Sequence, residues 1–118
     1  MTFQTLTPTQ FVADGAGLDI TANLAAPTNV NLQFQNTGHE QLFVAPTATS
    51  ETVTVDIGVT VLGQTVANFT AVAMTTGHIY AFGPFHSAID QPGGSAAQIT
   101  LSTTTAITVG LFQTVGVF

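Results

Sequence analysis

The sequence predicts an all-β fold: a single antiparallel β-sandwich or small β-barrel with an extended N-terminal arm. Three observations predict it. Threonine occurs 22 times, and together with Val and Phe it favours the half-buried surface of a strand. Short segments alternate apolar and polar residues with a period of two, which gives a strand one apolar face. Turn-forming Gly and Pro residues recur about every ten residues, a spacing typical of antiparallel sandwiches and barrels.

Three segments alternate strictly and predict strands at residues 29–35, 52–57 and 107–112. In the first of them, Val30, Leu32 and Phe34 alternate with Asn and Gln side chains, so one face is apolar and the other carries amides. Less regular patterns predict further strands, which we expect at residues 18–22, 41–45, 59–62, 69–73, 78–82 and 97–101. We find no helical period of 3.6 residues, so any helix is expected to be short.

Turn signals separate these segments, at residues 14–17, 26–29, 36–38, 45–46, 76–77 and 91–94. Each contains a Gly that tolerates positive φ or a Pro whose φ is fixed. A chain of 118 residues suits one domain. We expect a β-sandwich domain at residues 13–118, preceded at residues 1–12 by a Thr-rich arm with isolated Phe3 and Leu6. Such an arm can add to the sheet edge of another subunit, or it can be a frayed terminus.

The charge composition excludes several classes of function. The chain has no Lys, no Arg and six carboxylates, so its formal net charge is −6 at pH 7. Binding of DNA or RNA needs cations that neutralise phosphates, and docking on anionic lipid needs a basic patch. We therefore expect neither a nucleic-acid partner nor a membrane partner. Cysteine is absent, which excludes disulfides and Cys-ligated metals.

The hydropathy indicates a folded core. Hydrophobic residues make up 45% of the chain and its mean hydropathy is +0.44, whereas disordered chains combine low hydrophobicity with high net charge. The apolar runs are much shorter than the ~20 residues of a membrane-spanning helix. The N-terminal residues contain neither a basic nor an apolar stretch, so we expect no secretory signal.

The histidines are the candidates for a metal or proton-transfer site. They are His39, His78 and His86, and no two of them have the i, i+2 or i, i+4 spacing that places two ligands on one face. Residues 86–90 contain His, Ser and Asp, but a catalytic triad is assembled from distant segments and the G-x-S-x-G turn is absent. We therefore expect no metal, no cofactor and no enzymatic activity.

Abundant Thr, Asn, Gln and Phe predict an uncharged surface that can form hydrogen bonds and pack. The cores of permanent interfaces are poor in charge and rich in aromatic residues. Nine phenylalanines exceed what one small sandwich core readily accommodates. We expect Phe85, in a Gly-Pro-Phe turn, and Phe118, at the C-terminal end, to face a partner. With Phe3 and Leu6 of the arm, they are the candidate interface residues.

Four segments carry a resemblance to a known family. Residues 78–86 read His-Ile-Tyr-Ala-Phe-Gly-Pro-Phe-His, and a Gly-containing turn and the Thr-rich residues 98–109 follow. Upstream lie residues 30–35 with their Asn-Thr-Gly turn, and residues 51–57. In pattern and order, these segments resemble small decoration (cement) proteins of tailed bacteriophage heads. The resemblance spans roughly residues 28–112.

The resemblance implies a β-domain that binds the outer surface of an assembled capsid, commonly as a trimer near three-fold positions, where it bridges neighbouring capsomers. It implies two partners, the major capsid protein and further copies of the chain, and a place on the outside of the virion after assembly in the host cytoplasm.

Two alternatives come from other classes of protein. A tail-fibre domain, or another carbohydrate- or receptor-binding module, would also be rich in Thr and Asn, but it should present aromatic platforms. The chain has no Trp and one Tyr, Tyr80. A metal-dependent small-barrel enzyme would need His39, His78 and His86 to converge in space.

Overall fold

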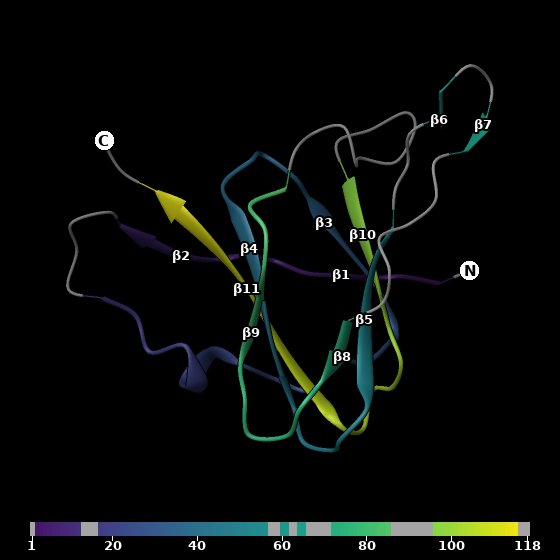
Figure 1. Ribbon diagram of the computed structural model, residues 1–118. Coiled ribbons are helices and arrows are strands. Elements are labelled where there is room, and N and C mark those ends of the chain that lie inside the picture. The colour runs from purple at the N-terminus through teal and green to yellow at the C-terminus, as the bar shows by residue number, and fades with distance from the viewer. Residues whose placement is uncertain are drawn as a thin grey trace.

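The computed structural model describes residues 2–12, 17–56, 60–61, 64–65, 72–85 and 96–115, and these residues form the all-β fold that the sequence predicts (Figure 1). The strands are β1 (Gln4–Thr5), β2 (Thr9–Val12), β3 (Asn31–Gln35), β4 (Glu40–Pro46), β5 (Glu51–Asp56), β6 (Thr60–Val61), β7 (Gln64–Thr65), β8 (Val72–Met74), β9 (Tyr80–Phe82), β10 (Ala96–Leu101) and β11 (Ile107–Val115). A short 3-10 helix, η1 (Thr21–Asn23), precedes β3. None of the described helical residues form a helix long and apolar enough to cross a membrane.

The main strands form two sheets. Sheet A has the order β1-β3-β10-β5-β8, sheet B has the order β2-β11-β4-β9, and β6 pairs with β7. From β2 to β5, and again from β8 to β11, consecutive strands lie in opposite sheets. The orders β3-β10-β5-β8 and β2-β11-β4-β9 are those of a jelly-roll sandwich. Two features depart from that fold: β2 runs parallel to β11, and the additional strand β1 runs parallel to β3.

Antiparallel pairs form the centre of each sheet. In sheet A, β10 lies between β3 and β5, so that Ile99 is opposite Leu32 on one side and Val55 on the other. In sheet B, β11 pairs with β4 along the whole length of β4. Of the two C-terminal strands, β10 is thus central in sheet A and β11 is central in sheet B. Most of the strand pairing therefore joins segments that are far apart in the sequence.

The core lies between the two sheets and follows the period of two. In β3, Leu32 and Phe34 are buried while Asn31, Gln33 and Gln35 point outward. The same alternation in the other strands supplies most of the remaining core, and Phe85, in the turn after β9, completes it. The whole core comprises Leu32, Phe34, Leu42, Val44, Val53, Val55, Met74, Phe85, Ala97, Ile99, Leu101, Ile107, Val109 and Leu111. Each large side chain buried in this way contributes about 1.5–3 kcal/mol of transfer free energy.

The N-terminal residues are extended, as predicted, but they do not form a free arm. β1 is a parallel edge strand beside β3 in sheet A, and β2 is a parallel edge strand beside β11 in sheet B. Between them, Leu6 packs against the core, and its amide donates to the carbonyl of Gln33 at 2.8 Å. Figure 1 shows this segment crossing the molecule from one sheet to the other. The sheet edges left open by β3 and β11 provide backbone partners, so residues 2–12 belong to the sandwich.

Two further local predictions are wrong. Residues 18–22 were expected to form a strand, but η1 forms there, with the backbone amide of Ala22 donating to the carboxylate of Asp19. Pro46 was expected in a turn, but it is the last residue of β4, where its missing N–H removes little pairing.

The Thr-Gly turns are confirmed where they are described. Gly38 and Gly77 both adopt a φ of 88°, a conformation that favours glycine. The predicted strands at residues 59–62 and 69–73 lie partly outside the described residues. So does the turn at 14–17, and the turn at 91–94 lies wholly outside them.

Candidate binding surface

The four predicted interface residues have different environments. Phe85 is only 7% exposed, and its ring centroid lies 5.4 Å from that of Phe34 in the core, so the prediction that Phe85 faces a partner is wrong. The chain can turn inward after β9 because Gly83 adopts a φ of 106°. Leu6 is partly buried against the core, and Phe3 is half-buried. Phe118 lies outside the described residues.

The histidines do not meet in the part of the chain that the structure describes. His39 and His78 are both exposed, and the ring of His78 stacks on Tyr80 with centroids 6.3 Å apart. His86 and the rest of residues 86–90 lie outside the described residues. Among the residues described, no group of three His, Asp or Glu side chains could hold a metal ion.

A buried carboxylate at the start of β4 is the main polar feature of the interior. Glu40 is 1% exposed. Its Oε1 accepts a hydrogen bond from the backbone amide of Thr37 at 2.6 Å, and its Oε2 accepts from the Thr37 hydroxyl and from Nε2 of Gln113, both at 2.6 Å. Gln113 in turn accepts a hydrogen bond at 2.8 Å from Nε2 of Gln10 on β2. These contacts connect β4, the turn before it, β11 and the N-terminal segment.

The hydrogen bonds keep this carboxylate ionised. Burial by itself raises the pKa of Glu40, but the hydrogen bonds from Thr37 and Gln113 outweigh burial and leave the pKa below its ordinary value. A pocket of about 270 Å³ adjoins Glu40, and residues 5–8 form one of its walls. Glu40 is not among the candidate residues predicted from the sequence. Its position in the sequence could have indicated that it is buried. Glu40, Leu42 and Val44 alternate with outward residues along β4, and all three point into the core.

The outer face of sheet B is partly covered. Phe112 points away from the core on β11, yet it is only 1% exposed, and its ring packs edge-on against Phe43 with centroids 5.1 Å apart. The segment around η1 crosses this face: a Cβ at Gly110 would lie 2.8 Å from the carbonyl oxygen of Asn23 and 3.0 Å from Leu24. Asn23 and Leu24 therefore shield part of this face from any partner.

On the outer face of sheet A, the outward residues of β3, β5 and β10 carry one carboxylate, and all of these described residues are exposed or half-buried. They are Asn31, Gln33, Gln35, Thr52, Thr54, Asp56, Ala96, Gln98 and Thr100. The side chains of Gln35, Thr54 and Gln98 make no hydrogen bond to other described residues, so they can bond to a partner. We call this surface the amide face.

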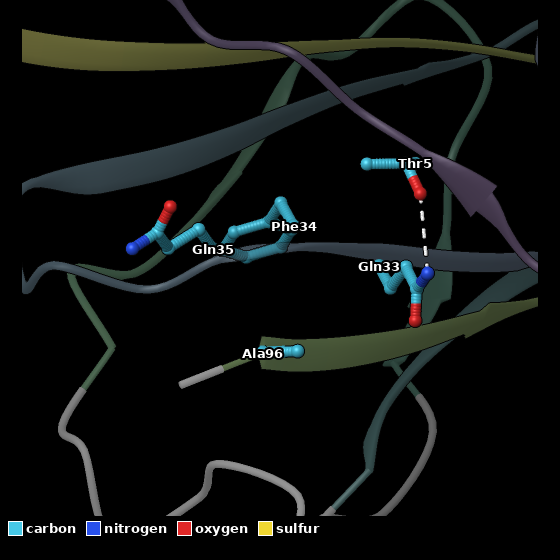
Figure 2. A pocket seen from close by; sticks show the side chains of 5 residues that line it. All are labelled: Thr5, Gln33, Phe34, Gln35 and Ala96. Carbon is cyan, nitrogen blue, oxygen red and sulfur yellow. Dashed lines mark hydrogen bonds between the residues drawn. The ribbon is translucent and has the colours of Figure 1, made fainter. Parts of the chain in front are cut away.

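A shallow pocket of about 290 Å³ lies on the amide face beside β1. Thr5, Gln33, Phe34, Gln35 and Ala96 line it. Figure 2 shows Nε2 of Gln33 donating to the hydroxyl of Thr5 at 3.1 Å, while the amide of Gln35 points away from both. Ala96 is opposite Gln35 in the register, and its small side chain leaves space there. The residues that line the pocket offer hydrogen-bond donors and acceptors, and none of them is charged.

The carboxylate on the amide face is Asp56, at the end of β5. Burial raises the pKa of Asp56 above its ordinary value, while a hydrogen bond from the hydroxyl of Thr100, at 2.9 Å, acts in the opposite direction. Its ionised form is therefore less favourable in the folded protein than in water.

Comparisons with known proteins do not assign a family. The chain matches no protein-family model, and it matches neither a curated protein nor a solved structure.

Proposed function

We propose that the chain is a structural virion protein, a decoration (cement) protein that binds the outer surface of a bacteriophage head and staples neighbouring capsomers. The observation that carries the proposal is the amide face, an open sheet surface with unused amide and hydroxyl groups and a single carboxylate. Such a surface suits a permanent contact, because interface cores are depleted in charge. The segments that resemble decoration proteins include β3, β5 and β10, which form this face.

The mechanism we propose is non-catalytic and multivalent. Each subunit offers a neutral interface of modest strength. In a homotrimer, the first contact holds the other subunits close to neighbouring capsomers, so that later contacts form at high effective concentration. Avidity can then exceed the affinity of one subunit by about 10²–10⁴-fold.

A carbohydrate- or receptor-binding role is less well supported. Sugar-binding surfaces commonly use aromatic rings, and the outward residues of the amide face include no aromatic side chain. On the outer face of sheet B, Phe43 is packed against Phe112. Binding of the purified protein to glycans, without any binding to a capsid shell, would favour this role over decoration.

The first prediction concerns the shell itself. Capsid shells reconstituted with the protein are expected to withstand higher temperature and internal pressure than shells without it, because each bound trimer bridges several capsomers. The measurement is the temperature at which filled shells release their DNA. Equal release temperatures with saturating protein bound would reject the stapling role.

The second prediction tests the amide face. Replacing Gln35→Glu is expected to weaken binding to the shell about tenfold or more, because the new carboxylate would be buried without a partner cation, at a cost of about 1–3 kcal/mol. Gln41→Glu is the matched control: it makes the same isosteric change on the outer face of sheet B. The measurement is the dissociation constant of each variant from empty shells. Equal loss in both variants, or loss in Gln41→Glu alone, would place the docking surface elsewhere.

A further inference from the structure

The pocket on the amide face and the pocket beside Glu40 adjoin each other. Thr5 and Gln35 line both of them. Figure 2 shows these two side chains at the first pocket, where the amide of Gln35 points away from the hydrogen bond between Thr5 and Gln33. A partner that docks on the amide face therefore also lies beside the second pocket, which we call the carboxylate pocket.

The carboxylate pocket has a negative charge that the chain's own basic residues cannot balance. Among the described residues that line it, Glu40 is the ionisable one. Its hydrogen bonds come from neutral groups, the amide and hydroxyl of Thr37 and the side-chain amide of Gln113. They lower the pKa of Glu40 and so favour its ionised form, but they do not neutralise it. Since the chain has no Lys or Arg, a cation of either type has to come from another molecule.

The position of this charge increases what a cation would gain there. Glu40 is 1% exposed, so water and dissolved ions screen its carboxylate poorly. Opposite charges attract more strongly in such surroundings than at an open surface. Residues 5–8 form one wall of the pocket, and the part of a ligand that carries the cation would lie against them.

The hydrogen bonds already present favour an ammonium group over a guanidinium group. Oε2 of Glu40 accepts two hydrogen bonds and Oε1 accepts one. An arginine binds a carboxylate best through two parallel N–H bonds, one to each oxygen, and Oε2 has both of its acceptor sites in use. A lysine ammonium is a compact charge with three donors and needs no such pair. Gln35, Thr5 and Thr7 line the pocket with further oxygens that can accept from it.

The size and the apolar wall of the pocket suit one long side chain. Leu6 and Pro8 line it and are both half-buried. Lysine buries its methylene stem along apolar surface while its charged end remains with polar groups. The volume of about 270 Å³ is below the roughly 300–1,000 Å³ of pockets for drug-sized molecules. The pocket therefore fits a side chain better than a larger ligand.

We propose that the carboxylate pocket receives the ammonium group of a lysine from the protein that docks on the amide face, and that Glu40 accepts it. The identity of that partner as a capsid protein rests on the proposed function, whereas the selection of a lysine does not. One ammonium group balances one carboxylate. A second carboxylate introduced beside it, as in Gln35→Glu, would still lack a cation.

The first test examines the pocket alone, with the purified full-length protein. The probe is Nα-acetyl-lysine methylamide. The corresponding norleucine compound has an aliphatic side chain without charge, and the corresponding arginine compound has a cation of the other shape. NMR signals of the Thr37 backbone amide and the Gln113 side-chain amide report on Glu40, because both groups donate to it. We expect a saturable shift with the lysine probe, weaker binding of the arginine probe and none of the norleucine probe.

Two results of this titration would overturn the inference. One is no saturable shift with the lysine probe, and the other is arginine or norleucine binding as tightly as lysine. Glu40→Gln is expected to weaken binding of the lysine probe about tenfold or more. Glu51→Gln is the matched control, because it removes a different carboxylate, one that accepts from the Ser102 hydroxyl at 2.6 Å. Equal weakening in both variants would also contradict a specific role of Glu40. The comparison of probes on the wild type is independent of how stable Glu40→Gln is.

The second test uses capsid shells whose lysines have been acetylated, which removes their charge. The wild type is expected to bind these shells about tenfold or more weakly than untreated shells. Glu40→Gln lacks the acceptor and should bind both kinds of shell equally. Equal binding of the wild type to both would overturn the lysine contact and leave the decoration function standing. No binding to untreated shells would overturn the decoration function, while the probe titration still decides what the pocket binds.

Discussion

Replacing Glu40→Gln is expected to lower the free energy of unfolding by about 1–3 kcal/mol at pH 7. The carboxylate of Glu40 accepts three hydrogen bonds, two from Thr37 and one from Gln113. A glutamine has one acceptor oxygen, and its NH₂ group would face a donor instead of accepting from it. At least one buried donor would lose its partner. The measurement is chemical unfolding of both proteins, monitored by circular dichroism.

The effect of Glu40→Gln should depend on pH in a defined direction. The pKa of Glu40 lies below its ordinary value of 4.5 in the folded protein, so its ionised form contributes stability that is present above that value. This contribution is lost as the pH falls through the folded-state pKa. The difference between the wild type and Glu40→Gln is therefore expected to be constant near neutral pH and to shrink below about pH 4.5. Asp56, whose pKa is raised, is the same in both proteins and cancels in the comparison.

A second variant separates hydrogen bonding from simple loss of charge. Combining Glu40→Gln with Gln113→Glu exchanges the amide and the carboxylate, so that the new amide on β4 can donate to the new carboxylate on β11. We expect the double variant to recover part of the lost stability, because the new NH₂ group at position 40 then has an acceptor on β11. If Glu40→Gln is as stable as the wild type at pH 7, the carboxylate has no structural role.

Replacing Gly83→Ala is expected to be among the most destabilising single changes, by about 2–5 kcal/mol. Gly83 adopts a φ of 106°, which disfavours any residue with a Cβ. In addition, that Cβ would lie 2.8 Å from the carbonyl oxygen of Glu40 and 2.9 Å from the ring of Phe85. Both atoms belong to the interior, so relief of the clash would displace Phe85 or β4. The measurement is the midpoint of thermal and chemical unfolding.

Gly77 and Gly110 act as controls for the two causes of destabilisation, which are the positive φ and the clash of the added Cβ. Gly77 adopts a φ of 88°, but nothing lies within 4 Å of its added Cβ, so Gly77→Ala should cost only about 1–2 kcal/mol. At Gly110 no positive φ is involved, yet a Cβ would meet Asn23 at 2.8 Å. Gly110→Ala should therefore displace the segment that covers Phe112. Equal costs for Gly83→Ala and Gly77→Ala would show that the clash with Glu40 and Phe85 is relieved easily.

Much of the sandwich could be predicted from local pattern. Residues 29–35, 52–57 and 107–112 were expected as strands, and β3, β5 and β11 lie there, because alternation directly reports one buried face. The N-terminal residues and residues 18–22 were less predictable. Their sequence is compatible with several extended or turn conformations. The edges of β3 and β11 pair with the N-terminal residues, and at residues 18–22 the amide of Ala22 donates to Asp19 in η1.

Local pattern was least informative about single side chains. Phe85, in a Gly-Pro-Phe turn, has the sequence context of an exposed loop residue, yet it packs on Phe34. Glu40 is a residue type that normally lies at the surface, yet it is buried. Hydrogen bonds from Thr37 and Gln113 stabilise its ionised carboxylate there. In both cases the deciding partners come from other elements, and the periodicity of one segment carries no information about them.

By itself, the amino-acid sequence determined that this protein is an all-β domain rich in hydrogen-bonding side chains, with six carboxylates and no cation of its own beyond histidine. Composition and period are local properties, so the sequence alone carries them. Only the tertiary structure decided which strands become neighbours, which face stays open and where the N-terminal residues lie. Those outcomes depend on contacts such as the one between Gln10 and Gln113, which are 103 positions apart. They exist only after the two sheets have packed on a common core.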